Sequence, residues 1–187
     1  MALSNSMFPI GLFVGVDPGT QKTNLGLAFV DHDGKLVHCC SVEHMVGWPR
    51  HHDGPRDGIS DKLWNLKWRF ANAFSKAWPY VAPLPVLLGG IEDQWVGKNS
   101  QVALTLSKQF GAIFTALADQ GVYSVKIQPT QAKKALTGSG KATKDEMVRF
   151  AQILGMQGDN DNVADAIGIA LATRAMYMEW EIGQLGN

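Results

Sequence analysis

The chain has 187 residues, of which 45% are hydrophobic, and this length and composition suit a single domain, residues 1–187, with a sizeable buried core. Its 17 Lys and Arg residues balance 17 Asp and Glu residues, so the overall charge neither supports nor excludes nucleic acid as a partner. No apolar run approaches the ~20 residues of a membrane span and the first residues lack the charged region of a signal peptide, so we expect a soluble cytoplasmic protein.

A short apolar strand predicted at residues 12–17 ends in the carboxylate of Asp17. Its near-continuous run of apolar side chains is typical of a strand covered on both faces, and Pro18-Gly19 stops it directly after the Asp. In open α/β sheets, ligands bind beyond the carboxyl ends of the strands, so Asp17 is a candidate functional residue. For this stretch alone, an Asp that only initiates a turn before Pro-Gly is an equally good interpretation.

Two further strands, at residues 24–30 and 35–43, are predicted to complete an antiparallel meander with the first. The only two cysteines, Cys39 and Cys40, are neighbours on the last strand and so point to opposite faces, which argues against a disulfide framework. Residues 47–60 are rich in Gly, Pro and charge and are expected to form an exposed loop. The paired histidines of this loop lack other ligands at metal-binding spacing, so we do not assign them a metal.

Helices and strands are predicted to alternate after this loop. A helix from Ser60 to about Trp78, ended by Pro79, carries Trp64 and Trp68 close to its apolar stripe, where aromatic side chains favour a core or a subunit interface. The elements expected to follow are a strand at 86–91 that again ends in a carboxylate, Glu92, a helix at 99–119, a strand at 121–127, and helices at 129–136 and 144–155. The fold class is therefore α/β, with three antiparallel strands followed by two strand-helix units.

The stretch from residue 120 to residue 144 contains lysines and no acidic residue. A lysine run usually marks a solvated face, but here the acids are displaced to the segment that follows. A basic surface would then lie beside an acidic one, which is the pairing needed to hold a phosphate backbone near bound cations. The lysines are Lys126, Lys133, Lys134, Lys141 and Lys144.

A last helix is predicted to begin near residue 161, with Asp165 in its early part. Positions three and four apart share a helix face, so Asn162 and Asp161 each project on the same side as Asp165. Acids near a helix start are also favoured by the helix dipole alone.

Three separate elements thus offer an acid: Asp17, Glu92 and Asp165. Convergent carboxylates repel one another unless a cation bridges them, and hard oxygen ligands without Cys or His favour Mg²⁺ or Mn²⁺. Two such ions ~3.5–4 Å apart can activate a water and stabilise the leaving oxygen in phosphodiester cleavage.

Four motifs that together span nearly the full chain occur in this order: Val14-Gly-Val-Asp17-Pro-Gly-Thr20, Ile91-Glu92 with Lys98-Asn99 shortly after, Lys133-Lys-Ala-Leu-Thr-Gly-Ser-Gly-Lys-Ala-Thr-Lys144, and Ala164-Asp165-Ala-Ile-Gly-Ile-Ala. The set resembles the RuvC family of Holliday junction resolvases. The resemblance implies a ribonuclease H-like fold, with a five-stranded mixed sheet in order 3-2-1-4-5 flanked by helices. It also implies a homodimer that nicks opposed strands of a four-way DNA junction with divalent metal, a reaction of DNA recombination and repair.

The same resemblance implies roles for particular residues. It places catalytic, metal-binding residues at Asp17, Glu92, Asp165 and position 162, with two ions expected in each active site. In the sheet order implied, strands 1 and 4 are neighbours, which agrees with carboxylates at both strand ends. The DNA-binding residues expected from the motifs are Lys98, Asn99, Lys133, Lys134, Ser139, Lys141 and Lys144.

Position 162 departs from the family pattern, because the acid expected three residues before Asp165 is Asn162. Asn keeps a carbonyl oxygen but loses the charge, so the chain is expected to cleave poorly, either as an inactivated Asp-to-Asn variant or with Asp161 as the substitute ligand. The 47–60 loop is longer than in compact bacterial members and suggests a divergent, phage-encoded relative.

Two other functions remain open from the sequence. The first is a non-catalytic junction-binding protein with a degenerate site, which Asn162 favours. The second is a fragment of an actin-like ATPase or sugar kinase, whose first phosphate loop the Asp17-Pro-Gly-Thr20 turn also resembles. Such proteins need two domains around the nucleotide, and no second phosphate loop is visible in this chain.

Overall fold

The computed structural model describes residues 10–19, 24–42, 59–93 and 100–185, with only the backbone described at 59–65, 100–103, 105, 106 and 185. These residues form a five-stranded sheet in the order β3-β2-β1-β4-β5. The first three strands pair antiparallel, whereas β4 pairs parallel with both β1 and β5, so the predicted mixed sheet is confirmed. The strands are β1 Leu12–Asp17, β2 Leu25–Asp31, β3 Leu36–Val42, β4 Val86–Glu92 and β5 Ser124–Ile127.

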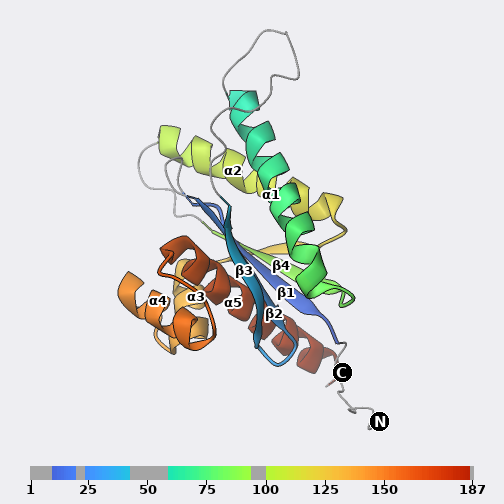
Figure 1. Ribbon diagram of the computed structural model, residues 1–187, viewed down its shortest axis with the longest axis vertical. Helices are drawn as coiled ribbons and strands as arrows, with labels where there is room; N and C mark the ends of the chain where they lie inside the picture. The colour runs from blue at the N-terminus through green and yellow to red at the C-terminus, as the bar shows by residue number, and fades with distance from the viewer. Residues whose placement is uncertain (1–9, 20–23, 43–58, 94–99, 186–187) are drawn as a thin grey trace.

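Helices cover both faces of the sheet (Figure 1). On one face lie α1 and α2, and on the other lies α5, with α3 and α4 packed beside it. The bounds are α1 Ile59–Val81, α2 Ser100–Asp119, α3 Pro129–Thr137, α4 Lys144–Ile153 and α5 Asp161–Leu185. No helix among the described residues is both long enough and apolar enough to cross a membrane.

The α1 helix differs from its prediction at both ends. It begins at Ile59, so Ser60 lies inside the helix rather than capping it, and it continues past Pro79 to Val81. A proline lacks an N–H and its ring crowds the preceding turn, but the residues after it can still donate to carbonyls before it, so it need not end a helix in the last turn. Here Ala82 N donates to Trp78 O at 2.9 Å, which closes that turn beyond the proline.

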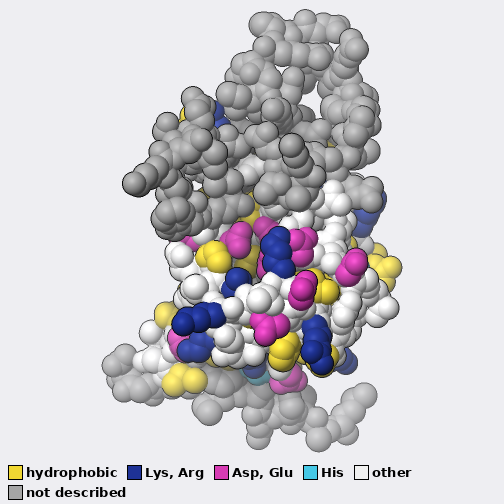
Figure 2. Space-filling model, turned by 90° about the vertical axis from the view of Figure 1, so that its left-hand side faces the viewer, with side chains coloured by type: hydrophobic (Ala, Val, Ile, Leu, Met, Phe, Trp, Pro, Cys, Tyr) yellow, Lys and Arg dark blue, Asp and Glu magenta, His cyan; other side chains and the backbone are white. Residues whose placement is uncertain are grey.

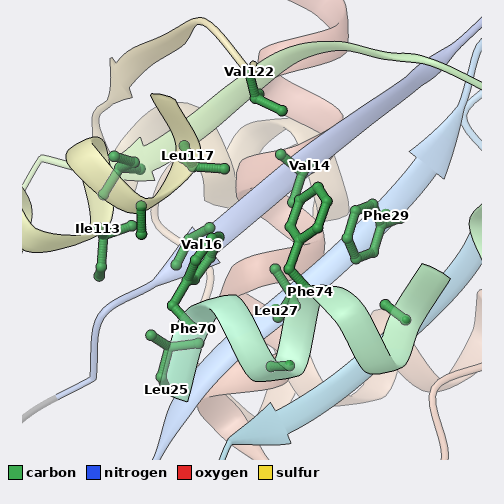
Figure 3. Packing of buried hydrophobic residues seen from close by; sticks show 14 of the residues in the cluster. Val14, Val16, Leu25, Leu27, Phe29, Phe70, Phe74, Ile113, Leu117 and Val122 are labelled. Atoms are coloured by element: carbon green, nitrogen blue, oxygen red, sulfur yellow. The ribbon is translucent and has the colours of Figure 1, made fainter. Parts of the chain in front are cut away.

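Alternate side chains of the strands fill the two cores. Val14 and Val16 of β1 face α1 and α2, where they pack with Phe70, Phe74 and other buried residues (Figure 3). Phe13 points the other way and packs against α5. The same alternation places Cys39 and Cys40 in different cores, and both are free thiols, as predicted from their adjacency.

Two glycines let α5 lie directly against the sheet backbone. A Cβ atom at Gly15 would lie 2.1 Å from Ala166 O, and one at Gly26 would lie 2.0 Å from Asn162 O. Any larger residue at either position would therefore push the helix away from β1 or β2. Because Asp17 ends β1, this contact fixes the start of α5 relative to that carboxylate.

Candidate active site

Two carboxylates end neighbouring parallel strands. Val16 of β1 pairs with Ile91 of β4, and each strand ends at its next residue, Asp17 and Glu92. Parallel strands that end together present their last side chains at one edge of the sheet, the usual place for ligands in α/β folds. Asp17 is only 5% exposed, and its Oδ1 accepts a hydrogen bond of 2.9 Å from Gly19 N in the turn that Pro18 begins.

The start of α5 brings the polar residues of the last segment to the same edge. Asn160 precedes the helix, and its Oδ1 accepts from Val163 N at 3.1 Å, as a helix cap does. Asn162 is buried, and its Nδ2 donates to Asn24 O at 2.6 Å, just before β2. The Asn162 side chain thus links α5 to the sheet, a bond that a carboxylate could not donate.

Burial and mutual repulsion shift the acids toward their neutral forms. Burial above all, with the Glu92 carboxylate second, raises the pKa of Asp17 to about 8. Burial and then the Asp165 carboxylate raise the pKa of Glu92 to about 7. Burial also raises the pKa of Asp165, against the attraction of Lys144. We call Asp17, Glu92 and Asp165 the acidic cluster, since each carboxylate is coupled to at least one of the others.

Two lysines of the predicted basic stretch, Lys133 and Lys144, act electrostatically on this cluster. Figure 2 shows acidic and basic side chains intermingled on the face that carries α3 and α4. Lys144 Nζ lies 2.5 Å from Asp161 Oδ2. This contact lowers the pKa of Asp161 and raises that of Lys144. Lys133 on α3 attracts the carboxylates of Glu92 and Asp165.

The other residues expected to bind DNA are placed unevenly. Lys134 and Lys141 are exposed, and Ser139 Oγ accepts from Lys141 N at 3.3 Å in the loop that joins α3 to α4. Lys126 belongs to the basic stretch but not to the expected DNA-binding set, and it forms an ion pair of 3.2 Å with Asp93 and lies over the Phe110 ring. Thr20, Lys98, Asn99 and the loop residues 47–58 fall outside the described residues.

The donor set fits a hard divalent cation in its chemistry. Buried carboxylates with raised pKa values are held together at a cost in repulsion that a bound cation would relieve. As placed, no three His, Cys, Asp or Glu side chains in the described part of the chain are close enough to hold one ion. The cluster is therefore electrostatically coupled without forming a closed ligand shell.

Sequence reasoning missed the contacts that hold the site together. The Asn24 carbonyl, which accepts from Asn162, is a backbone group and carries no sequence signal. The role of Asn160 as the N-cap of α5 could have been predicted from the sequence, because Asn directly before a helix is a common cap. The ion pair between Lys144 and Asp161 joins residues 17 apart on different helices, so only the fold brings them together.

Comparisons with known proteins show which family this chain resembles in sequence. The family described as crossover junction endodeoxyribonuclease RuvC matches residues 83–173. A relative of that name from Delftia acidovorans is 31% identical over 180 residues, which cover 92% of this chain and 91% of the relative. One from Pelotomaculum thermopropionicum is 28% identical over 91% of this chain and 96% of its own length.

The fold comparison points the same way. The structure described as T. thermophilus RuvC in complex with Holliday junction substrate superposes with a TM-score of 0.65 at 22% identity, covering 91% of this chain and 96% of that one. The relatives named are bacterial and lend no support to the phage origin expected from the 47–60 loop. By its sequence similarity over nearly its whole length and by its fold, the chain belongs to the RuvC crossover junction endodeoxyribonuclease family.

Proposed function

We propose that this chain is a structure-selective endonuclease that binds four-way DNA junctions as a homodimer and nicks opposed strands by metal-dependent hydrolysis. The observation that carries the proposal is the meeting of Asp17 and Glu92 at adjacent strand ends, coupled to Asp165 and bordered by lysines. A phosphodiester needs that combination, because positive groups must hold the backbone while carboxylates hold the cations. Such an enzyme would act on branched DNA in the cytoplasm.

The roles we propose follow the positions of the side chains. Asp17, Glu92 and Asp165 would hold the metal, with Asn162 contributing a neutral oxygen or Asp161 substituting for it. Two Mg²⁺ or Mn²⁺ ions at these oxygens would supply an activated water and stabilise the leaving oxygen. Lys133 lies near Glu92 and Asp165, so its ammonium would hold a phosphate next to the acidic cluster. Lys134, Ser139, Lys141 and Lys144 would contact the flanking backbone. Lys98 and Asn99 lie outside the described residues, and we propose the same role for them from the family motifs alone.

Titration of a labelled four-way junction in EDTA, Ca²⁺ and Mg²⁺ tests this function. We expect tight junction binding in EDTA and Ca²⁺, weaker binding to linear duplex, and paired nicks in Mg²⁺ or Mn²⁺. Binding without nicks in either metal would identify a non-catalytic junction-binding protein, the candidate that the neutral Asn162 favours. Equal affinity for junction and duplex would contradict the proposal.

The basic residues make a separate prediction. Replacing Lys133 and Lys134 by Ala should weaken junction binding and reduce its log–log salt slope by roughly 1 for each lost phosphate contact. Fluorescence anisotropy between 50 and 200 mM salt measures both the affinity and its salt slope, because counterion release changes the affinity strongly over this range. Lys35→Ala is the control, since Lys35 is exposed in the turn between β2 and β3. An unchanged salt slope in the double variant would mean that these lysines face solvent and do not contact phosphates.

A dimer is proposed because a four-way junction presents equivalent strands to a two-fold pair of sites. Two apolar side chains of α2 offer an interface, since Leu104 is 51% exposed and Phe114 is 43% exposed. Trp68, which is 36% exposed, lies on α1, the helix that packs against α2. Sedimentation should give twice the 20.3 kDa of one chain at micromolar protein, and Phe114→Glu should shift it toward the monomer. Trp180→Glu, at an exposed position near the end of α5, should not. A monomer both free and on a junction would exclude this arrangement.

A further inference from the structure

The Lys144 side chain joins two helix starts. Lys144 is the first residue of α4 and Asp161 the first of α5, and their charged atoms lie 2.5 Å apart. The start of α4 is fixed by a capping box, in which Thr143 Oγ1 accepts from Glu146 N and Glu146 Oε2 accepts from Thr143 N. The start of α5 is fixed by the Asn162 bond to Asn24 O. Both partners of the ion pair thus project from well-defined backbone.

The same ammonium is attracted to every member of the acidic cluster. Besides Asp161, its charge interacts favourably with Asp165 and Asp17, and it favours the ionised form of Glu92. Its side chain nevertheless remains 72% exposed. One exposed lysine, held at the start of α5 by its ion pair with Asp161, therefore acts on all the carboxylates of the acidic cluster.

We propose that the Lys144 ammonium is the resident counter-cation of the acidic cluster in the DNA-free protein, anchored there by Asp161, and that divalent cations bind only against its repulsion. This inference rests on the proposed function, since it concerns the same metal site. A phosphate that binds Lys144 draws its charge away from the carboxylates and removes that repulsion. Junction DNA and divalent metal then each tighten the binding of the other, because such coupling is reciprocal. As a result, the metal sites would be only partly occupied until DNA binds.

Calcium binding without DNA tests the proposal directly. Isothermal titration of Ca²⁺ into Lys144→Met should give a dissociation constant about fivefold lower than that of the parent, since a positive charge at short range has been removed. Lys144→Arg keeps the charge and should bind Ca²⁺ as the parent does. Arg149→Met is the matched control, because Arg149 is an exposed cation on the same helix and is not among the charges that shift the cluster.

The junction arm uses the same variants. For the parent, Ca²⁺ should tighten junction binding relative to EDTA, and in Lys144→Met this enhancement should shrink while the affinity in EDTA falls. Unchanged or weaker Ca²⁺ binding by Lys144→Met, or an equal gain in Arg149→Met, would overturn the counter-cation role while leaving the nuclease proposal intact. If neither parent nor variants bound Ca²⁺ with or without DNA, both proposals would fall.

Discussion

Asp17→Asn is expected to abolish Mg²⁺-dependent nicking and, at the same time, to stabilise the metal-free protein. Asn keeps the oxygen that accepts from Gly19 N but carries no charge to bind a cation. In the parent, folding raises the pKa of Asp17 from 3.8 to about 8, so between these values the folded state holds a proton that the unfolded state releases. Stability of the parent in EDTA therefore falls as pH rises through this window, and the variant escapes that loss.

Thermal melts in EDTA from pH 5 to pH 9 measure the effect. The gain in Tm for Asp17→Asn should be small at pH 5, grow up to about pH 8 and then level off, reaching roughly 5 °C or more. Mg²⁺ should stabilise the parent more than the variant. Asp33→Asn, in the exposed turn after β2, controls for loss of an acid alone. A variant that still nicks would remove Asp17 from the metal site, and a variant that is less stable in EDTA at pH 8 would contradict the raised pKa of Asp17.

Asn162→Asp is expected to raise Mg²⁺-dependent nicking by about tenfold to a hundredfold, because hard cations depend on carboxylate charge to replace part of their water shell. The substitution also removes the donor to Asn24 O in a buried position. The variant should therefore be less stable in EDTA by about 1–3 kcal/mol and regain stability when Mg²⁺ binds. Single-turnover cleavage and melts in EDTA and Mg²⁺ measure the two effects on one sample.

Asp161→Asn is the companion variant. If Asp161 is the working ligand, Asn162→Asp would change cleavage little and Asp161→Asn would abolish it. If Asp161 only anchors Lys144, its loss would leave cutting by Asn162→Asp largely intact. Junction affinity in Ca²⁺ should change little in Asn162→Asp, since phosphate contacts come mainly from lysines. Robust activity unaffected by either substitution would contradict the metal assignment on α5.

The elements of this fold were predictable because their local signals were strong. Continuous apolar runs bounded by Pro-Gly or a carboxylate mark β1 and β4, and both strands end at the predicted acid. The end of α1 was missed because Pro79 lies in the last turn, where the helix can bypass it. Strand β5 is shorter than predicted, since Gly121 adopts a positive φ and turns the chain before Ser124.

The site itself was only partly predictable. Residue spacing could place Asp17 and Glu92 at strand ends, but their adjacency followed from the sheet order that the family resemblance implied. The pairing of Lys144 with Asp161 and the bond from Asn162 to Asn24 depend on how α4 and α5 pack, which no local pattern encodes. Charge segregation suggested that lysines would lie beside acids, without saying which lysine meets which acid.

The close contact of α5 with Gly15 and Gly26 has a consequence for which positions of this sequence can change in evolution or in protein engineering. Because main chain meets main chain there, the spacing between the carboxyl end of β1 and the first turns of α5 does not depend on the sizes of packed side chains. Residues between the sheet and α1 or α2 can therefore exchange volume without moving the carboxylates. Substitutions meant to raise the stability of the protein are therefore best placed between the sheet and α1 or α2, with Gly15 and Gly26 left unchanged.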